Sequence, residues 1–550
     1  MAPLSVICSD AFDTSSSNVR IFLAGCLLFG QTSSGKPDTD DPCGNGRGHL
    51  DQRACALWRG PDGRRLPAPE DSVLTRIVRD VESQVLLDDR ADGPNYAAAD
   101  DSRRRVSRST PVERFRLLLR IWIIDFRERV LFDSSVFRVS AAVAGTTAGL
   151  VLLLARRGDS ALRLLSGVHR SGLLSWADDL IEWIFRNALR GSRLGHPLTT
   201  AIARQVQNWT DAPPTLAEDP ERLLGPLAMV LRSPDARHKG VLLLQYNYVF
   251  PLFAKCFDVH AIGKKYYIVL EPSWSGYCNT EVLCYARVAP PVFVQAYEPR
   301  DAHIVKSLDA GFDVVPTSAN WWVDHRVFTP MSDVQKDADL IMVAGWGGYK
   351  RHLAFFRGLR RLRGLHPRLR VLLVGYNLGM TKDEILGFAD HFDVADCLEV
   401  FENLTQPEVN RLLNRARVNV LWSRREGVNR AIIEGMFANL PCIVREGFNY
   451  GYRYEYINPS TGAFASERDF AEVALRLLES ADTLRPREWT MQHMSCQRST
   501  AILRATVDGS VDTGEDLAVK VNGLHGMHYW NEADAGRFTA DYEFLRRMRI

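Results

Sequence analysis

Apolar residues in the middle of the chain form short unbroken runs, and a stretch of helical pattern separates each run from the next. Runs of this length without polar interruption are typical of strands buried on both faces of a parallel sheet. The first predicted strands cover residues 240–246, 266–272, 291–297 and 312–318. Because the stretches between them fit helices, this part is predicted to be a Rossmann-like α/β domain.

The same alternation starts again after residue 338. Five further strands are predicted at 339–345, 369–375, 397–401, 418–422 and 441–444. Helices are predicted at 352–365, 382–391, 406–416, 429–438 and 467–479. The predicted fold class is therefore α/β, with two Rossmann-like, doubly wound parallel sheets that face a cleft and are joined by a linker over 320–339.

A helical pattern precedes the first sheet, over residues 111–190. Val112, Phe115, Leu119 and Trp122 recur every three or four positions, and arginines fill the other faces. Such a helix either lies on an anionic membrane surface or exposes its arginines to water as part of a helix bundle. The second interpretation is favoured.

An uncharged apolar stretch follows at residues 139–155. It is at the short end of the roughly 17 to 25 residues that a membrane-spanning helix needs. Glycine at positions 145 and 149 weakens it further. A buried helix is therefore favoured over membrane contact.

Composition suggests boundaries at both ends of the chain. Residues 1–105 are rich in glycine, proline and charged residues, which favours a disordered extension. Within it, Gly30–Lys36 matches most of a phosphate-binding loop, but Pro37 replaces the required Ser or Thr, so this interpretation is rejected. The predicted division is an extension at 1–105, a helical region at 106–212, Rossmann-like domains at 213–330 and 331–482, and a helical tail at 483–550.

Charge and cysteine content narrow the function classes. The 550 residues carry a formal net charge of +2, so no global field favours nucleic acid. The ten cysteines include no C-x-x-C pair, which gives no zinc spacing and fits a reducing compartment. Because the first residues also lack a signal-peptide pattern, we expect a cytoplasmic protein.

One loop of the second domain suits an anion. The predicted strand 339–345 is followed by Gly347, Gly348, Lys350 and Arg351, at the start of a predicted helix. Glycines let the backbone approach a ligand, and the first N–H groups of a helix attract anions. Cations at this end oppose the helix dipole, and an anionic ligand would resolve the conflict. The alternative is a basic helix start on an arginine-rich chain.

A second loop carries two carboxylates. Glu426 lies just after the predicted strand 418–422, with Gly427 beside it, and Glu434 follows two helical turns later. One carboxylate therefore reaches a ligand from the loop and the other from the helix. Gly375, at the end of the strand 369–375, belongs to the same edge of the sheet.

The order and spacing of these pieces resemble a known family. Residues 338 to about 480 are similar to the donor domain of the retaining GT-B glycosyltransferases of family 4, the glycosyl transferases group 1. The resemblance is carried by the Lys350 loop, Phe401–Asn403, Ser423–Gly427, Glu434–Pro441, Thr461–Gly462 and the entry segment Val323–Pro330. Two departures are Trp346, where the family usually has an arginine close before the lysine, and Asn439, where it has a glycine.

The resemblance implies roles for single residues. Lys350 would bind the donor diphosphate and Glu426 the hydroxyls of the donor sugar, and these two are the expected catalytic residues. Glu434 would bind the ribose of the nucleotide. The remaining expected donor-binding residues are Gly427, Val428, Asn429, Arg430, Arg351, Gly347, Gly348 and Gly375.

The first Rossmann-like domain is expected to hold the acceptor, although it shows no family motif. The residues that follow its strands 240–246 and 266–272 should face the cleft; the alternative is a buried turn. The acceptor-side candidates are Glu271, Ser273, Trp274, Gly276 and Asn247.

The expected function is therefore transfer of a hexose-like sugar from a nucleotide diphosphate sugar, with retention of configuration, in polysaccharide biosynthesis. The acceptor is a glycan, a lipid-linked molecule or another compound, and the membrane contact of the helical region stays an alternative. No Asp-x-Asp pair stands at a predicted strand end, so neither a metal nor a cofactor beyond the co-substrate is expected. The alternatives are a non-catalytic sugar-nucleotide-binding or scaffold protein, and a GT-B phosphorylase or epimerase.

Overall fold

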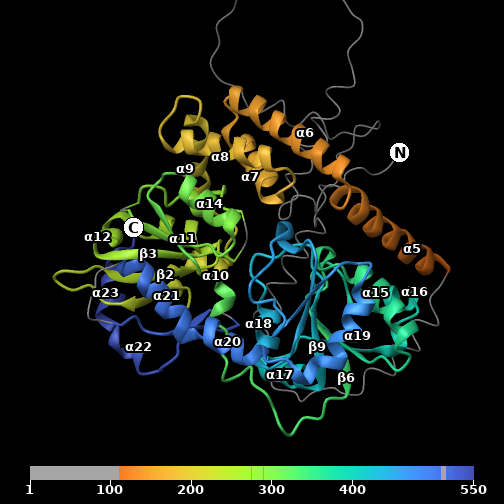
Figure 1. The fold of residues 1–550 in the computed structure, drawn as a ribbon. Coiled ribbons are helices and arrows are strands. Elements are labelled where there is room, and N and C mark those ends of the chain that lie inside the picture. Colours follow the sequence, from red (N-terminus) through yellow and green to blue (C-terminus); the bar gives the residue numbers. More distant parts are fainter. Residues whose placement is uncertain (1–110, 274–275, 289, 510–515, 525) are drawn as a thin grey trace, which may run out of the picture. The chain divides into compact units, whose positions relative to one another are not determined.

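The computed structural model describes residues 111–550 apart from 274–275, 289, 510–515 and 525. Contacts divide the chain into two units, and all the described residues belong to the unit formed by Met1–Phe22 and Ala97–Ile550. The predicted extension at 1–105 lies outside the described residues. The fold is α/β with two mainly parallel sheets, preceded by a helical region, as the sequence predicts (Figure 1).

The first sheet holds five strands in chain order, β1-β2-β3-β4-β5. β2 to β5 are parallel and fall within the four predicted runs, whereas β1 pairs antiparallel with β2 at the edge and is not among the predicted strands. The strands are β1 Ala228–Arg232, β2 Gly240–Gln245, β3 Tyr266–Glu271, β4 Val292–Gln295 and β5 Phe312–Val315. The helices are α10 Pro214–Glu218, η4 Pro220–Leu223, α11 Val249–Cys256, α12 Val259–Lys265, α13 Thr280–Leu283, α14 Pro299–Ser307 and η5 Ala319–Trp321.

The second sheet has the order β11-β10-β9-β6-β7-β8, all parallel, and its strand order reverses between β6 and β9. Ligands bind beyond the carboxyl ends of strands at such a switch point. The strands are β6 Ala338–Val343, β7 Val371–Gly375, β8 Leu398–Glu402, β9 Ala416–Leu421, β10 Cys442–Arg445 and β11 Gly462–Ala465. The helices are η6 Gly348–Lys350, α15 His352–Leu365, α16 Lys382–His391, η7 Ala395–Cys397, α17 Gln406–Arg415, α18 Arg430–Phe437, η8 Phe448–Gly451, α19 Phe470–Ser480 and η9 Ala481–Thr483.

The switch point explains why two distant loops meet. β6 and β9 are hydrogen-bonded neighbours, with Leu340 opposite Val418. The loop after β6 carries Lys350, and the loop after β9 carries Glu426. Both loops therefore leave the same edge of the sheet at adjacent positions.

The helical region consists of α5 Pro111–Phe126, η3 Arg127–Phe132, α6 Ser135–Leu154, α7 Gly158–Ser171, α8 Ser175–Leu189 and α9 His196–Gln207. The prediction of a buried helix at 139–155 is wrong, and α5 leaves the apolar residues that mark its periodicity exposed. Phe115 and Trp122 of α5 are 66% and 60% exposed, and only 28% of the most apolar window of α6 is buried. Among the described residues, α6 is the helix whose length and composition would suffice to cross a bilayer.

Helix α5 has apolar residues on two sides, and one of these sides packs on the second domain. Leu117, Ile121 and Ile124 contact the core of that domain. The ion pair of Arg120 with Glu384, and that of Asp125 with Arg357 of α15 at 2.6 Å, hold the same side. The other apolar side is left toward solvent.

The C-terminal segment returns to the first domain. Asp508 at the end of α21 accepts a 2.8 Å hydrogen bond from Arg232 of β1, and the amide of Ile550 donates to the carbonyl of Cys256. Phe544 stacks on Tyr266 of β3. The elements are α20 Pro486–Met494, α21 Cys496–Asp508, β12 Lys520–Asn522, β13 Met527–Tyr529, α22 Asp534–Arg537 and α23 Thr539–Arg547, so the tail contains a hairpin as well as helices.

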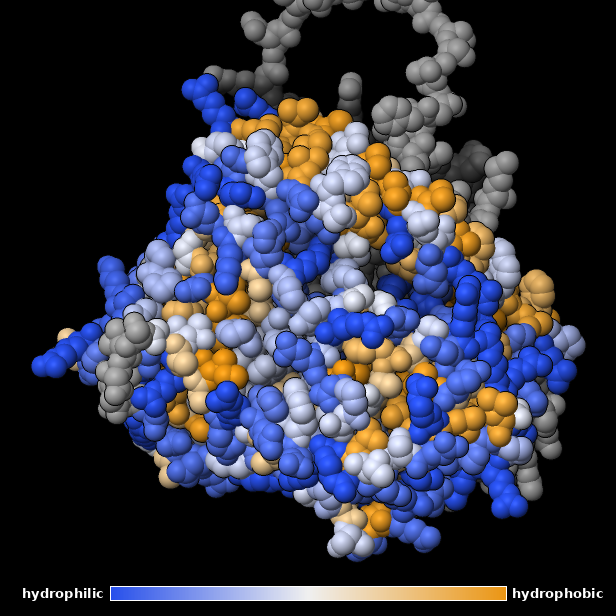
Figure 2. All heavy atoms as spheres, in the orientation of Figure 1, coloured by the Kyte–Doolittle hydropathy of each residue, from blue (hydrophilic) through white to orange (hydrophobic). Residues whose placement is uncertain are grey.

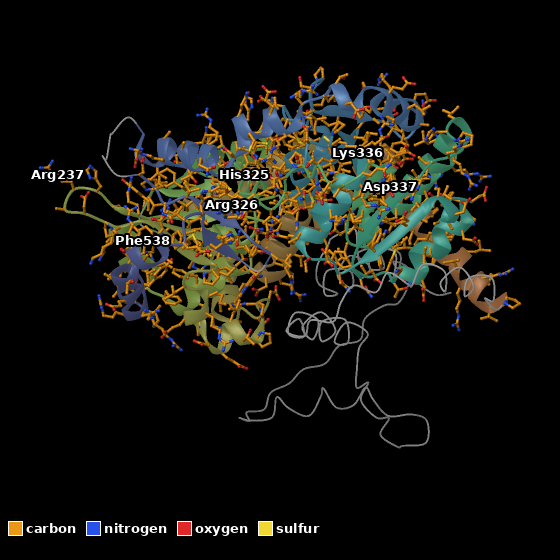
Figure 3. The ribbon with its side chains drawn as sticks, turned by 90° about the horizontal axis from the view of Figure 1, so that it is seen from below. Arg237, His325, Arg326, Lys336, Asp337 and Phe538 are labelled. Atoms are coloured by element: carbon orange, nitrogen blue, oxygen red, sulfur yellow. The ribbon has the colours of Figure 1, made fainter. Side chains whose placement is uncertain are left out.

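The predicted linker contacts the C-terminal segment near its beginning and the second domain near its end. Figure 3 labels His325 and Arg326 near its beginning and Lys336 and Asp337 near its end. The His325 ring lies 4.6 Å from the ring of Trp530 in the C-terminal segment. Toward the other end, the Lys336 ammonium donates to the carbonyl of Ala416 at the start of β9.

A fully buried ion pair joins β3 to the C-terminal hairpin. Lys520 Nζ lies 2.7 Å from Glu271 Oε2, and neither side chain is exposed. Gln245, Gln295 and Asn522 each donate a side-chain N–H to the same carboxylate at 2.9–3.0 Å. Burial lowers the pKa of Lys520, and the neighbouring Glu271 opposes that effect.

Lys520→Met should strongly destabilise the first domain, because it leaves the Glu271 charge buried without its counter-ion. Loss of one partner of a buried pair typically destabilises by about 3–5 kcal/mol. Urea unfolding followed by tryptophan fluorescence would measure this. The double variant Lys520→Met, Glu271→Gln should regain most of the loss, and a single variant as stable as the wild type would contradict the assignment.

Candidate functional site

Lys350 and Glu426, predicted from separate loops, form a direct ion pair. The ammonium nitrogen lies 2.7 Å from Glu426 Oε1, and the two side chains are only 12% and 8% exposed. Lys350 ends the short helix η6, and α15 starts two residues later. The two residues that the resemblance assigns to a sugar nucleotide are thus adjacent at the carboxyl edge of the second sheet.

Two further side chains orient the Glu426 carboxylate and its loop. The Ser423 hydroxyl donates to Oε1, and Asn429 Nδ2 donates to Oε2 at 2.8 Å. The side-chain oxygen of Asn429 also caps α18, because it accepts from the amide of Ile432 at 2.9 Å. The polar side chains of the loop 423–429 therefore hold the loop in the observed conformation.

Glu434 lies two turns into α18 and is paired with Arg430 at 3.3 Å. Burial raises the pKa of Glu434, and the Arg430 charge opposes the shift. The Arg430 guanidinium also donates to the carbonyls of Asn522 and Gly523. Arg430 is thus shared between the expected ribose ligand and the C-terminal hairpin.

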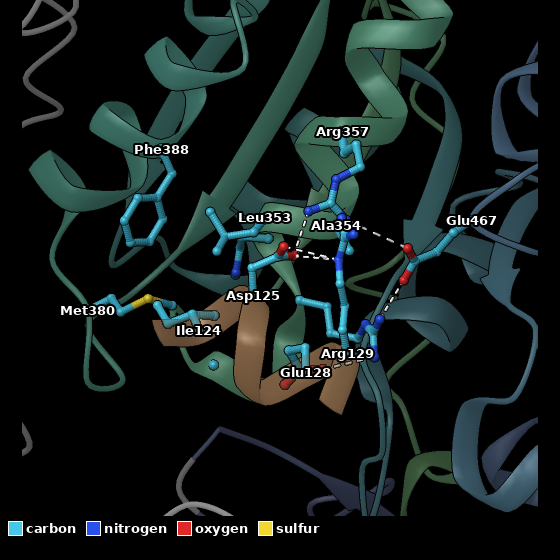
Figure 4. Close-up of a pocket in the computed structure, with 13 residues that line it drawn as sticks. Ile124, Asp125, Glu128, Arg129, Leu353, Ala354, Arg357, Met380, Phe388 and Glu467 are labelled. Carbon is cyan, nitrogen blue, oxygen red and sulfur yellow. Dashed lines mark hydrogen bonds and ion pairs between the residues drawn. The ribbon is translucent and has the colours of Figure 1, made fainter. Parts of the chain in front are cut away.

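Two residues that the sequence analysis assigns to the donor site, Arg351 and Gly375, have other contacts in the structure. Arg351 is buried and turned toward the helical region, where it lies 2.8 Å from Glu128 and also contacts Asp133 and Glu467. Arg351 lines a pocket between η3 and α15, and Figure 4 labels Glu128 and Glu467 among the other lining residues. The two terminal nitrogens of the Arg351 guanidinium are thus paired with these three carboxylates.

Gly375 is also explained by packing. A Cβ atom at this position would lie 2.3 Å from Trp346 Nε1, so the indole requires a glycine beneath it. Trp346 is fully buried. The residue that stands where the family has an arginine therefore serves the core of this sheet.

The acceptor-side candidates do not converge on one surface. Glu271 is sealed in its buried ion pair, which no acceptor reaches. Asn247 Oδ1 accepts from the amide of Ser273 at 2.7 Å and so closes the turn after β3. Gly276 adopts a positive φ of 88° against Arg170 of α7. Trp274 lies outside the described residues.

A polar pocket is lined by residues of both Rossmann-like domains. Most of these residues are not among the predicted ones. They come from the ends of β4 and β5 and from the loop after β10, and they face Gly427 and Asn429. Its lining is Pro272, Tyr277, Gln295, Tyr297, Glu298, Asp301, Ser318, Asn320, Gly427, Asn429, Phe448, Asn449, Tyr454 and Tyr456. The carboxyl-end rule, extended from β2 and β3 to β4, would have selected Tyr297 and Glu298.

Asn449 connects the pocket to the Glu426 loop. Its side-chain oxygen accepts from the Glu426 amide at 2.8 Å, and its nitrogen donates to Glu298 Oε1 at 2.8 Å. Asn320 Nδ2 similarly donates to the carbonyl of Asn429 at 2.7 Å. Two asparagines thus fix the Glu426 loop against the first domain.

The Glu298 carboxyl is tuned to titrate near neutral pH. Burial, reinforced by the charge of Asp301, raises its pKa to about 8, while hydrogen bonds from Tyr454 and Asn449 oppose the shift. Burial likewise raises the pKa of Asp301, against the opposing charge of Arg300. The pocket therefore holds carboxyl groups that can keep or release a proton at physiological pH.

Glu298→Gln should flatten the pH dependence of stability. The carboxyl favours its protonated form in the folded protein, so its contribution is fully present below the unfolded-state pKa of about 4.5 and is lost as pH rises toward 8. Melting temperatures from pH 5 to pH 8 should fall more for the wild type than for this variant. Glu479→Gln, on the exposed side of α19, is the matched control; equal slopes in all three proteins would contradict the shift.

The comparison with protein-family models concerns the second domain. Residues 332–487 match the family model described as "Glycosyl transferases group 1". A search of curated proteins gives no significant match.

Solved structures that align with the chain include S. aureus TarM with UDP (12% identity, TM-score 0.37, 45% of this chain and 52% of that one). Sucrose-phosphate synthase from Thermosynechococcus elongatus aligns at 14% identity and a TM-score of 0.37, over 48% of this chain and 71% of that one. Anabaena HepE with UDP and glucose aligns at 11% identity and a TM-score of 0.37, over 47% of this chain and 81% of that one. The chain thus spans about half the length of the first of these. Residues 332–487 are thus similar to the glycosyl transferases group 1 domain.

Proposed function

We propose that this protein transfers a sugar from a nucleotide diphosphate sugar to an acceptor bound in the polar pocket, with retention of configuration. The observation that carries the proposal is the Lys350–Glu426 pair at the switch point of the domain that matches the family model. This edge of a parallel sheet is where such folds bind nucleotides.

The ion pair serves as an exchangeable contact for the donor. A diphosphate offers Lys350 a stronger anionic partner than one carboxylate, and the amides at the start of α18 lie in the same loop. As the bond to the sugar breaks, negative charge grows on the departing diphosphate, and Lys350 stabilises it there. Glu426, released from the lysine, is free to accept hydrogen bonds from the sugar hydroxyls.

The acceptor side of the proposal rests on the pocket lining. Tyr297, Asn320 and Asn449 supply polar groups next to aromatic faces, which suits a sugar or another polyol. Glu298, mostly protonated near neutral pH, would donate a hydrogen bond to an acceptor hydroxyl. Hexosyl transfer, work in polysaccharide biosynthesis and a cytoplasmic location belong to the same proposal.

A second candidate is a protein that binds sugar nucleotides without transfer. Two observations favour it: Trp346 is buried, and Arg351 is held by three carboxylates. Trp346 carries no charge and the Arg351 charge is already paired, so neither residue supplies a second cation beside Lys350. Turnover of a labelled donor by purified protein separates the two candidates.

Lys350→Met should weaken nucleotide diphosphate and intact donor alike, since both lose a charge-assisted contact. Such a contact is worth about 1.5–3 kcal/mol, or roughly tenfold or more in Kd. Uridine, guanosine and adenosine diphosphates and their hexose derivatives would be screened by thermal shift, and the tightest pair would be titrated by calorimetry. Lys306→Met, an exposed lysine on α14, is the control.

Glu426→Gln should behave differently, because it removes the lysine's competing partner. Free diphosphate should bind at least as tightly as to the wild type, while turnover falls. Glu434→Gln should weaken both ligands, because the ribose is common to them. Normal turnover in all three variants, or loss of diphosphate binding in Glu426→Gln, would refute this placement of the donor.

Transfer should persist in EDTA, since the proposed stabilisation of the diphosphate uses Lys350 and helix amides and no metal. The measurement is the initial rate before and after chelation, with the same protein dialysed against buffer as reference. Loss of activity that Mn²⁺ or Mg²⁺ restores would contradict the proposal.

A further inference from the structure

The first helix of the described region presents its apolar side to solvent. Val112, Phe115, Leu119, Trp122 and Phe126 follow one another at three- or four-residue spacing, which puts them on one side of α5. Their exposed fractions are 59%, 66%, 44%, 60% and 39%. Soluble helices place such a stripe against the core, so this one calls for an apolar partner.

The next helix has the same inverted arrangement. In α6 the small residues are inside: a Cβ atom on Gly145 or Gly149 would lie 2.5 Å from a side chain of α7. The large residues are outside, and Val136, Val151 and Leu154 are 70%, 59% and 70% exposed. Figure 2 shows hydrophobic residues gathered over α6 and continuing over α5.

Charge and aromatic residues at the edges of this face match a lipid surface. α6 contains no acidic residue, and exposed Arg156 and Arg157 follow its C-terminal end, as Arg116 does within α5. α8, which contacts α6, adds the half-exposed Trp176 and Trp183. Indole rings favour the boundary between lipid headgroups and acyl chains, and arginine binds phosphate.

We propose that the exposed faces of α5 and α6, called here the apolar face, lie flat in the interface of a bilayer that contains anionic lipids. A helix of 20 residues is about 30 Å long, so the face is elongated, as interfacial helices are. A second copy of the chain would bring the same arginines against one another, whereas lipid phosphates neutralise them. α6 does not cross the bilayer, because one of its sides is packed against α7.

The test is flotation of the full-length protein with vesicles of phosphatidylcholine containing about one-third phosphatidylglycerol. The wild type should float with these vesicles, less with pure phosphatidylcholine, and less at high salt. Phe115→Asp combined with Trp122→Asp should lower the partition coefficient at least about tenfold, since two aromatic side chains no longer enter the interface. Leu365→Asp with Leu524→Asp, at residues 56% and 61% exposed outside the apolar face, should float like the wild type.

Three outcomes would overturn the proposal. The aspartate double variant floats as well as the wild type; the wild type stays off vesicles and is monomeric or self-associated; or it resists an alkaline carbonate wash, which would show a spanning segment. The inference does not rest on the proposed transfer. Calorimetric nucleotide binding without vesicles should be the same for the wild type and the Phe115, Trp122 double variant, so failure of one idea is distinguishable from failure of the other.

Discussion

The buried carboxylate of Glu271 is the constraint on which the arrangement of the site depends. A charge removed from water must be paired and hydrogen-bonded, and here the four partners come from three separate parts of the chain. Gln245 and Gln295 extend from the neighbouring strands, and Lys520 and Asn522 come from the C-terminal hairpin. The two glutamines tie the carboxyl ends of β2, β3 and β4 together, and the hairpin is locked beside them.

The same hairpin reaches the second domain. Asn522 donates to Glu271, and its own carbonyl accepts from Arg430 at the start of α18. Arg430 in turn pairs with Glu434. A continuous chain of polar contacts therefore runs from the centre of the first sheet to the helix that carries the expected ribose ligand, and the contacts of Asn320 and Asn449 run parallel to it. The geometry of the donor loop is a product of both domains.

Local patterns were sufficient for the elements but not for the pairs between them. Continuous apolar runs located β2 to β10, whereas the parallel edge strand β11 was not predicted. Helices α15 and α16 have the predicted bounds, helped at α16 by the capping box of Thr381 and Glu384. The convergence of Lys350 and Glu426 followed from the position of their loops after β6 and β9. By contrast, the antiparallel edge strand β1, which pairs with the next strand β2, and the hairpin of the three-residue strands β12 and β13 were not predicted.

Long-range pairing also decided which residues face a ligand. Arg351 is next to Lys350 in sequence, yet its carboxylate partner Glu128 lies more than two hundred positions away, which no local pattern reveals. The periodicity of α5 marked one apolar stripe, but the side that meets the protein is the one that carries Ile121 and the ion-paired Arg120 and Asp125.

Glu128 gives the helical region a direct hold on both donor loops. Its two oxygens pair with Arg351, adjacent to Lys350, and with Arg424, two residues before Glu426. A ligand that shifts η3 would therefore change the free energy with which a diphosphate binds between these loops. Thermodynamic linkage makes the effect reciprocal. A nucleotide that tightens the two loops around itself would alter, by the same factor, the affinity of the adjoining helix for whatever surface it meets. In the proposed function, the amount of sugar nucleotide and the attachment of the apolar face would then be variables of a single equilibrium.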